Sequence, residues 1–207
     1  FQIGCVYFFG GVAKLNPDWL FRAQPLRIWL AACGDFPLIG RLLVRPETAF
    51  AMSWAGLVFD LSVPFLLCFR RTRLPAYGAL VGFHVMTGKL FQLGMFPWIM
   101  SLSALLFFPP EAFAGVLGRI GGPPPVDDAP SSAAPLRTSL SVALALYVAV
   151  QIGLPLRQFL YPGNACWTEQ GYFFAWKVML MEKNGDTEHW VVDTVTQRRY
   201  LAEPREV

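Results

Sequence analysis

Charged residues are scarce in this chain of 207 residues. Asp, Glu, Lys and Arg make up 15% of it and hydrophobic residues 55%, and the mean hydropathy is +0.43. This composition is too apolar for an ordinary soluble domain and indicates a membrane protein. The net charge of +3 is small and the basic residues are dispersed, so no basic stripe for nucleic acid is present. We therefore expect a lipid bilayer, and no nucleic acid, as a partner.

Metal ligands and common catalytic motifs are also missing. The chain has two histidines, and its four cysteines show no CxxC or Cys/His spacing, which predicts free thiols and no metal site. No GxSxG, Walker A, GxGxxG or HExxH string occurs, and no signal peptide opens the chain. The sequence begins inside an apolar run at Phe1 and ends among charged residues, so we interpret it as a fragment of a larger protein.

Long apolar runs are what the sequence does have. The tail of a helix, a full span, a longer run broken near Pro97 and a final uncharged span are predicted at residues 1–13, 48–69, 74–108 and 138–155. The longer run is near the minimum for two crossings, so we expect a hairpin of two short helices. The predicted fold is mainly α: a polytopic helical membrane domain over residues 1–155, followed over 156–207 by the start of an antiparallel β domain.

The C-terminal region is predicted to form strands. Phe173–Glu182 is rich in aromatic and long apolar residues, Lys183–Asp186 (KNGD) is a hairpin turn signal, and His189–Val195 is the expected return strand. Arg198–Ala202 is expected to begin a third strand.

The distribution of arginines predicts the membrane topology. Arg70–Arg73 (RRTR) is the densest short basic segment, which favours a cytoplasmic location. Residues 14–47 and the β domain would then lie together on the extracytoplasmic side. We expect an integral membrane protein, of the inner membrane if the source is bacterial, with its active site on that outer side.

Lys14 is the first charged side chain after an uncharged apolar stretch. An ammonium at the edge of hydrocarbon is poorly solvated, which disfavours its charged form, and a lysine that is neutral part of the time can act as a base. The alternative is a lysine that snorkels to the headgroups, as many helix-end lysines do.

Two polar residues lie inside predicted spans. Asp60 is near the middle of one, and Pro64 four residues later has no amide proton to give the Asp60 carbonyl. His84 lies in the next apolar run. Intramembrane ionisable groups are candidates for a functional site, although a structural hydrogen bond explains either residue as well.

Four strings in this chain resemble the vitamin K-dependent gamma-glutamyl carboxylase family and its bacterial relatives that carry the horizontally transferred transmembrane (HTTM) domain. They are GVAKLNPDWL at 11–20, WAGLVFDLS at 54–62, FHVM with LFQLGMF between 83 and 96, and WTEQGYFFAW at 167–176. They occur in the family's order and span most of the chain. The resemblance favours a catalytic Lys14 over a snorkelling one.

The resemblance implies a reaction. Lys14 matches the family's base, which deprotonates vitamin K hydroquinone; oxygenation gives a strongly basic alkoxide that removes a γ-proton from a protein glutamate, and CO2 adds to the carbanion. The expected cofactor is reduced vitamin K or menaquinol, with O2 and CO2 as co-substrates and a glutamate-containing protein or peptide as partner. A cofactor must carry this step because no side chain is basic enough to remove a γ-C–H proton.

The resemblance also implies substrate-binding residues. Arg27 aligns with a family arginine near the substrate, and an arginine fork suits a carboxylate. Tyr172 and Trp176 fall in the family's substrate-binding segment, and Lys183 follows where the family has a basic residue. Packing in the β-domain core is the alternative for Tyr172 and Trp176.

Two other functions remain open from sequence. One is a quinol-linked membrane oxygenase or epoxidase that keeps Lys14 but does not carboxylate glutamate. The other is a non-enzymatic membrane binding or transport protein that uses Asp60 and His84.

Overall fold

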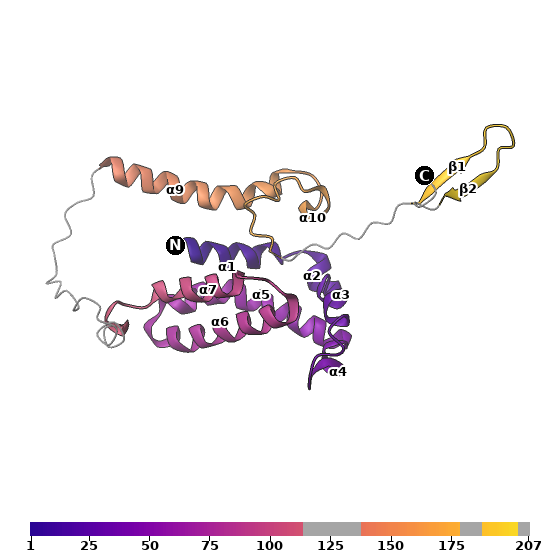
Figure 1. The fold of residues 1–207 in the computed structure, drawn as a ribbon. Coiled ribbons are helices and arrows are strands. Elements are labelled where there is room, and N and C mark those ends of the chain that lie inside the picture. The colour runs from indigo at the N-terminus through magenta and orange to yellow at the C-terminus, as the bar shows by residue number, and fades with distance from the viewer. Residues whose placement is uncertain (114–137, 179–187, 203–207) are drawn as a thin grey trace.

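A bundle of apolar helices forms the body of the molecule (Figure 1). The computed structural model describes residues 1–113, 138–178 and 188–202. The bundle consists of α1 (Gln2–Ala13), α5 (Pro46–Cys68), α6 (Arg70–Phe91) and α7 (Phe96–Ser103), the last continuing as a short 3-10 helix, η1 (Ala104–Phe107). Each of these helices packs against the next in that order.

Three short helices close one end of the bundle between α1 and α5. They are α2 (Pro17–Arg22), α3 (Leu26–Ala31) and α4 (Gly40–Leu43). The sequence starts α2 sharply, because the Asn16 side chain accepts a hydrogen bond from the Trp19 amide at 3.0 Å and Pro17 occupies the first turn. The chain thus turns directly after Lys14.

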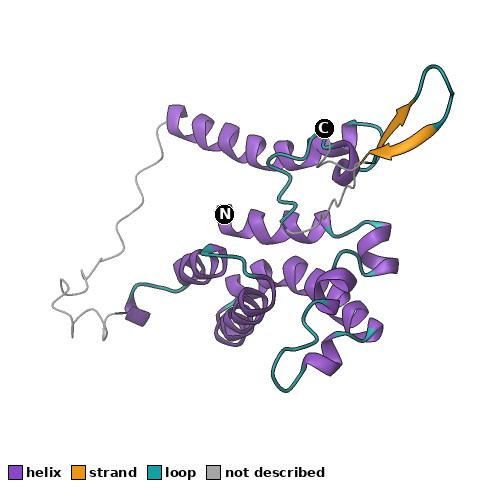
Figure 2. Ribbon diagram, turned by 45° about the vertical axis from the view of Figure 1, so that its right-hand side comes forward, coloured by secondary structure: helices purple, strands orange, loops and turns teal. Residues whose placement is uncertain are grey.

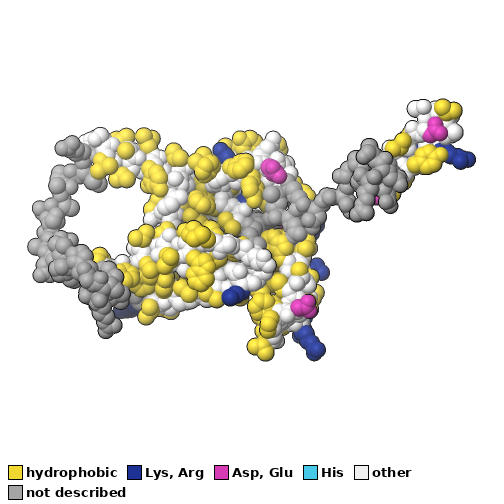
Figure 3. All heavy atoms as spheres, in the orientation of Figure 1, with side chains coloured by type: hydrophobic (Ala, Val, Ile, Leu, Met, Phe, Trp, Pro, Cys, Tyr) yellow, Lys and Arg dark blue, Asp and Glu magenta, His cyan; other side chains and the backbone are white. Residues whose placement is uncertain are grey.

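Helix α9 (Thr138–Leu156) lies along α1, with the Tyr147 hydroxyl donating to Gln2 Oε1 at 2.8 Å. It is followed by η2 (Arg157–Leu160) and α10 (Ala165–Thr168). Helix α9 and the bundle expose many hydrophobic side chains (yellow in Figure 3). Two helical stretches, Pro46–Cys68 and Thr138–Leu160, are long and apolar enough to cross a membrane. The apolar exteriors fit a hydrocarbon environment.

The predicted helical hairpin over residues 74–108 is confirmed. Helix α6 ends at Phe91, Gln92 and Gly94 take left-handed conformations, and Pro97 stands in the first turn of α7. The basic segment, however, is not a separate loop: Arg70–Arg73 forms the first turn of α6. Arg73 there donates to the carbonyls of Leu67 and Cys68 at the end of α5.

The described strands are β1 (His189–Val192) and β2 (Arg199–Ala202), an antiparallel pair with Val191 opposite Tyr200. They correspond to the predicted return and third strands. The turn between them is held by the Asp193 carboxylate, which accepts bonds from the Val195 amide and from Thr196. These bonds lower the pKa of Asp193.

The predicted strand over Phe173–Glu182 is wrong in its described part. Residues 171–178 form turns, and Gly171, Phe174 and Trp176 have φ values of 69°, 62° and 54°. Three left-handed residues in so short a segment cannot form an extended strand. The turn predicted at Lys183–Asp186 lies outside the described residues.

Residues 14–47 and residues 157–178 gather at the same end of the molecule (Figures 1 and 2). The α5–α6 turn, which carries the arginine-rich segment, lies at the opposite end. Two clusters of buried residues follow this division. One, around Trp19 and Leu30, underlies the short helices, and the other, around Leu67 and Leu80, fills the bundle.

Candidate active site

Lys14 does not extend outward from the end of α1. Its side chain is buried and turns back along the helix, so that Nζ donates to the Gly10 carbonyl at 3.2 Å. A helical Cα–Cβ bond points toward the helix N-terminus, and a lysine at the last turn can therefore reach back into the bundle. Trp19, just past the turn, places its ring 5.3 Å from Nζ. The structure thus has a buried lysine here and not a snorkelling one.

Asp60 of α5 is the anionic partner of Lys14. Oδ2 lies 2.5 Å from Lys14 Nζ, and only 11% of the lysine side chain and 9% of the aspartate side chain are exposed. Helices α1 and α5 approach closely because Gly11 has no side chain: a Cβ there would lie 2.7 Å from Leu61 Cδ2. The two charges are therefore held together in a low-dielectric site, where their attraction is strong.

His84 of α6 forms a second buried polar pair with Tyr7 of α1. The Tyr7 hydroxyl lies 2.7 Å from His84 Nε2, and His84 is only 3% exposed. The other ring nitrogen, Nδ1, has no hydrogen-bond partner among the described residues. A buried polar atom without a partner is costly, which makes Nδ1 an available contact for a ligand.

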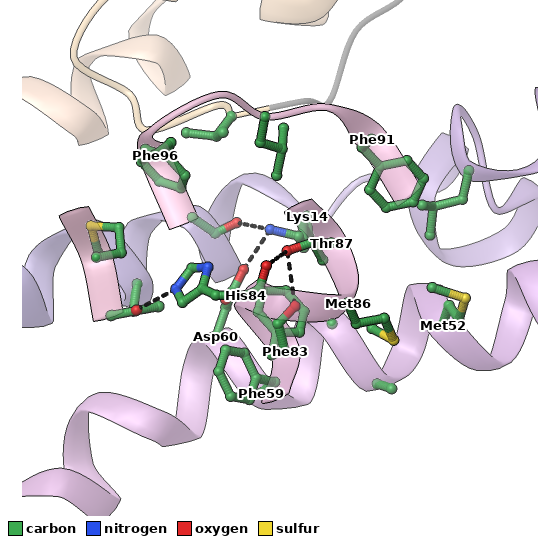
Figure 4. Close-up of a pocket in the computed structure, with 18 of the residues that line it drawn as sticks. Lys14, Met52, Phe59, Asp60, Phe83, His84, Met86, Thr87, Phe91 and Phe96 are labelled. Atoms are coloured by element: carbon green, nitrogen blue, oxygen red, sulfur yellow. Dashed lines mark hydrogen bonds and ion pairs between the residues drawn. The ribbon is translucent and has the colours of Figure 1, made fainter. Parts of the chain in front are cut away.

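Both polar pairs line one cavity of about 290 Å³ (Figure 4). In that view Lys14, Asp60, His84 and Thr87 lie together, and Phe59, Phe83, Phe91 and Phe96 surround them. The remaining walls come from α1, α5, α6, α7, the α6–α7 turn, the short helices and the segment after α10. They are Val6, Tyr7, Gly10, Trp19, Leu26, Trp29, Met52, Ala55, Gly56, Met86, Leu93, Met100, Trp176 and Val178. The cavity is thus aromatic and apolar, with its buried ionisable groups collected on one side.

Comparison with protein families gives this arrangement a context. The HTTM domain family matches residues 1–111, and the family "Vitamin K-dependent gamma-carboxylase, lumenal domain" matches residues 136–207. The chain belongs to the HTTM-domain family related to the vitamin K-dependent gamma-carboxylases. No solved structure matches the chain. The two matches follow one another along the chain, and the cavity is built from both, because Trp176 and Val178 come from the second.

The residues singled out from the sequence divide into two groups. Lys14, Asp60, His84 and Trp176 all line the cavity, although they come from four separate segments. Arg27 is an exposed residue of α3 and does not line it.

The remaining substrate-binding candidates lie elsewhere. Tyr172 is half-buried beside the cavity segment, where its hydroxyl donates to the Lys177 carbonyl at 3.0 Å. Burial, with smaller contributions from Cys166 and Glu169, raises the pKa of Tyr172. Lys183 lies outside the described residues.

Two contributors to the site were not expected from the sequence. Tyr7 sits in a uniformly apolar helix, and its partner is 77 positions away. Trp19 carries no local signal for a site either. A tyrosine hydroxyl inside an apolar segment needs a hydrogen-bond partner, and this requirement was the only sequence signal that Tyr7 contacts a polar residue.

Proposed function

We propose that this protein is a quinol-dependent carboxylase that converts protein glutamate to γ-carboxyglutamate, with Lys14 as the base that accepts a proton from the quinol. The observation that carries the proposal is the buried Lys14–Asp60 pair inside an aromatic cavity within a gamma-carboxylase-related fold. The expected quinol is reduced vitamin K or menaquinol.

The cavity suits a quinol head group. Its 290 Å³ is close to the lower limit, about 300 Å³, of typical ligand pockets, and its walls are aromatic and aliphatic. A quinol ring carries two oxygens, and the cavity offers two polar positions for them. One is the ammonium–carboxylate pair, and the other is Nδ1 of His84, which has no hydrogen-bond partner in the described part of the chain and whose Nε2 is held by Tyr7.

The Lys14–Asp60 pair also indicates how Lys14 accepts the proton of the quinol. A lysine that is protonated cannot take a proton, so Lys14 must first lose one. Asp60 Oδ2, at 2.5 Å, is the nearest acceptor, and in a low-dielectric site a neutral lysine–acid pair competes with the charged one. Asp60 thus both orients Lys14 and receives its proton.

The bound quinol, once oxidised by O2, supplies the base strength for carbon–proton removal that no side chain has. The protein's part is to bind it, to hold the first proton and to keep water out. The apolar lining excludes water, and Trp176 adds a wall from the C-terminal region. Arg27, Tyr172, Trp176 and Lys183 remain the proposed contacts of the glutamyl substrate.

The same geometry supports one other activity. Every group that would act on the quinol lines the cavity, whereas Arg27 does not. A quinol epoxidase that does not carboxylate glutamate needs only the groups that line the cavity. A transport protein is less well supported, because the buried charges are already paired with each other.

The direct test is incubation of the full-length protein in lipid nanodiscs with reduced vitamin K or menaquinol, O2, labelled bicarbonate and a glutamate peptide. Label incorporated into the peptide, together with quinone epoxide, is the expected result. Epoxide without label would assign the epoxidase function, and neither product with either quinol would refute the proposal. Sidedness is proposed with it: residues 14–47 and 156–207 face the extracytoplasmic side.

A further inference from the structure

The cavity that would hold the quinol head group is too small for the tail of the quinol as well. Its volume of about 290 Å³ is at the lower limit of typical ligand pockets, about 300 Å³. Reduced vitamin K and menaquinol each carry a long phytyl or isoprenoid chain. Such a chain is a hydrocarbon and is more stable in the bilayer than in water. The tail must therefore pass between two helices to reach the lipid.

Two of the helix seams beside the cavity are closed by close contacts. Helices α1 and α5 meet at Gly11, where an added Cβ would lie 2.7 Å from Leu61 Cδ2. Helices α6 and α7 meet at Gly88, where an added Cβ would lie 3.3 Å from Pro97 Cγ. Seams packed this closely leave no space for a hydrocarbon chain.

The seam between α5 and α6 is different at the level of the cavity. Ala55 of α5 and Met86 of α6 line the cavity and are also exposed on the surface of the molecule, Met86 at 41%. Met52, Phe59 and Phe83 complete this edge of the cavity, and each of them is half-buried. We call these five residues the lateral edge. The cavity thus reaches the outer surface between α5 and α6.

The lateral edge lies at a depth that suits the hydrocarbon layer. Ala55 is nine residues from Pro46, the start of α5, which is about 14 Å along the helix axis. The neighbouring Val58 and Val85 are apolar and exposed. Helix α9 packs against α1, on the side away from α6 (Figures 1 and 2), so it does not cover this edge. A chain that leaves here enters lipid directly.

The side chains of the lateral edge suit a flexible hydrocarbon. None of the five is charged, and the two methionines are unbranched and adapt their shape to a ligand. Phe59 and Phe83 stack with their ring centroids 4.3 Å apart and form a firm apolar wall on one side. We propose that the lateral edge is the exit through which the tail of the quinol passes into the bilayer. The identity of the ligand rests on the proposed function.

The first test is photo-cross-linking, which does not depend on turnover. A menaquinone analogue with a diazirine in its isoprenoid tail is bound to the full-length protein in nanodiscs, irradiated, and located by peptide mass spectrometry. Label that excess menaquinone displaces is expected within residues 51–59 and 82–90. Displaceable label confined to α1, α7 or α9 would overturn the proposal, as would label that menaquinone does not displace.

The second test narrows the exit. Ala55→Phe should weaken binding of the tailed quinone roughly tenfold or more, because a bulky ring must be displaced from the path of the tail. Binding of 2-methyl-1,4-naphthoquinone, which has no tail, should match wild type. Ala51→Phe is the matched control, since Ala51 is an exposed alanine of the same helix that does not line the cavity. Quenching of tryptophan fluorescence by the quinone measures both affinities.

The outcomes separate the exit from the proposed function. Equal losses for the tailed and tailless quinones would show that Ala55→Phe disturbs the head-group site, and unchanged binding of both would remove the exit from this edge. If Ala55→Phe lowers the melting temperature, Met86→Phe tests the same opening from α6. Label at the lateral edge supports the exit even if the protein carboxylates nothing. Carboxylation with label elsewhere would refute the exit and leave the function standing.

Discussion

Lys14 Nζ and Asp60 Oδ2 lie 2.5 Å apart although 46 positions separate the residues in the chain. Both side chains are almost fully buried and line the aromatic cavity, and they come from α1 and α5, which approach closely at Gly11. A buried ion pair of this kind adds little to the free energy of unfolding, because the cost of desolvating the two charges offsets much of their attraction. Its position in a cavity favours a chemical role, and the first three predictions concern it and its neighbour His84.

Replacement of Lys14 should abolish both quinone epoxidation and carboxylation. Lys14→Arg should fail as completely as Lys14→Ala, because a guanidinium stays charged and accepts no proton. A small amine should partly restore Lys14→Ala, at a rate that follows its basicity. Epoxide formation by Lys14→Arg in nanodiscs is the measurement. Activity near wild type there would refute the assignment of Lys14 as the base.

Asp60→Asn should remove quinol oxidation and also destabilise the protein. The substitution leaves a buried ammonium without its counter-charge, which typically costs about 3–5 kcal/mol. Asp18→Asn is the matched control, because Asp18 pairs with Arg22 at an exposed site, where an ion pair contributes less than about 1 kcal/mol. The check is to measure the melting temperature and the rate of epoxide formation for wild type, Asp60→Asn and Asp18→Asn. Equal stability of the two variants would contradict a buried charged pair.

Loss of the His84 contact should weaken quinol binding more than it slows turnover. His84→Phe keeps a ring but removes both nitrogens, and Tyr7→Phe removes the hydroxyl that holds Nε2. A neutral hydrogen bond contributes about 0.5–1.5 kcal/mol, so the KM for quinol should rise roughly two- to tenfold. Tyr77→Phe, on the same helix as His84 but outside the cavity, should leave KM unchanged. A KM unaffected in His84→Phe would show that Nδ1 does not contact the quinol.

Arg27→Ala distinguishes a substrate contact from a surface charge. If Arg27 binds the glutamyl peptide, its loss should raise the KM for the peptide roughly 10- to 150-fold, because a charged hydrogen bond contributes about 1.5–3 kcal/mol. Quinol oxidation should survive. Arg41→Ala removes another exposed arginine from the same end of the molecule and serves as control. Peptide kinetics that match this control would assign the role to other residues.

Sidedness is testable with single-cysteine variants in intact cells. Leu38→Cys and Gln170→Cys place thiols at exposed positions of the end that carries residues 14–47 and 157–178, and the native exposed Cys68 marks the opposite end. An impermeant maleimide should label the first two from outside and Cys68 only after the cells are opened. The reverse pattern would invert the proposed topology.

The sequence by itself determined the apolar helices and the polar residues that interrupt them. The spans, the hairpin break near Pro97 and the buried candidates Lys14, Asp60 and His84 follow from runs of hydropathy and from the cost of charge in an apolar segment. These are local properties of the sequence. They predict the structure correctly because each span lies in an apolar environment, whichever helices pack against it.

Tertiary structure decided which of these residues meet. The pairing of Lys14 with Asp60 depends on the close approach that Gly11 permits, and Tyr7 acquired a role only because His84 packs opposite it. The strand predicted from Phe173 is wrong in its described part because the composition of the segment favours a strand, whereas Phe174 and Trp176 have left-handed backbone conformations that composition does not reveal. That backbone turns Trp176 into the cavity and Lys177 away from it. Contacts between distant segments have no local signature in a sequence, and the site is made of such contacts.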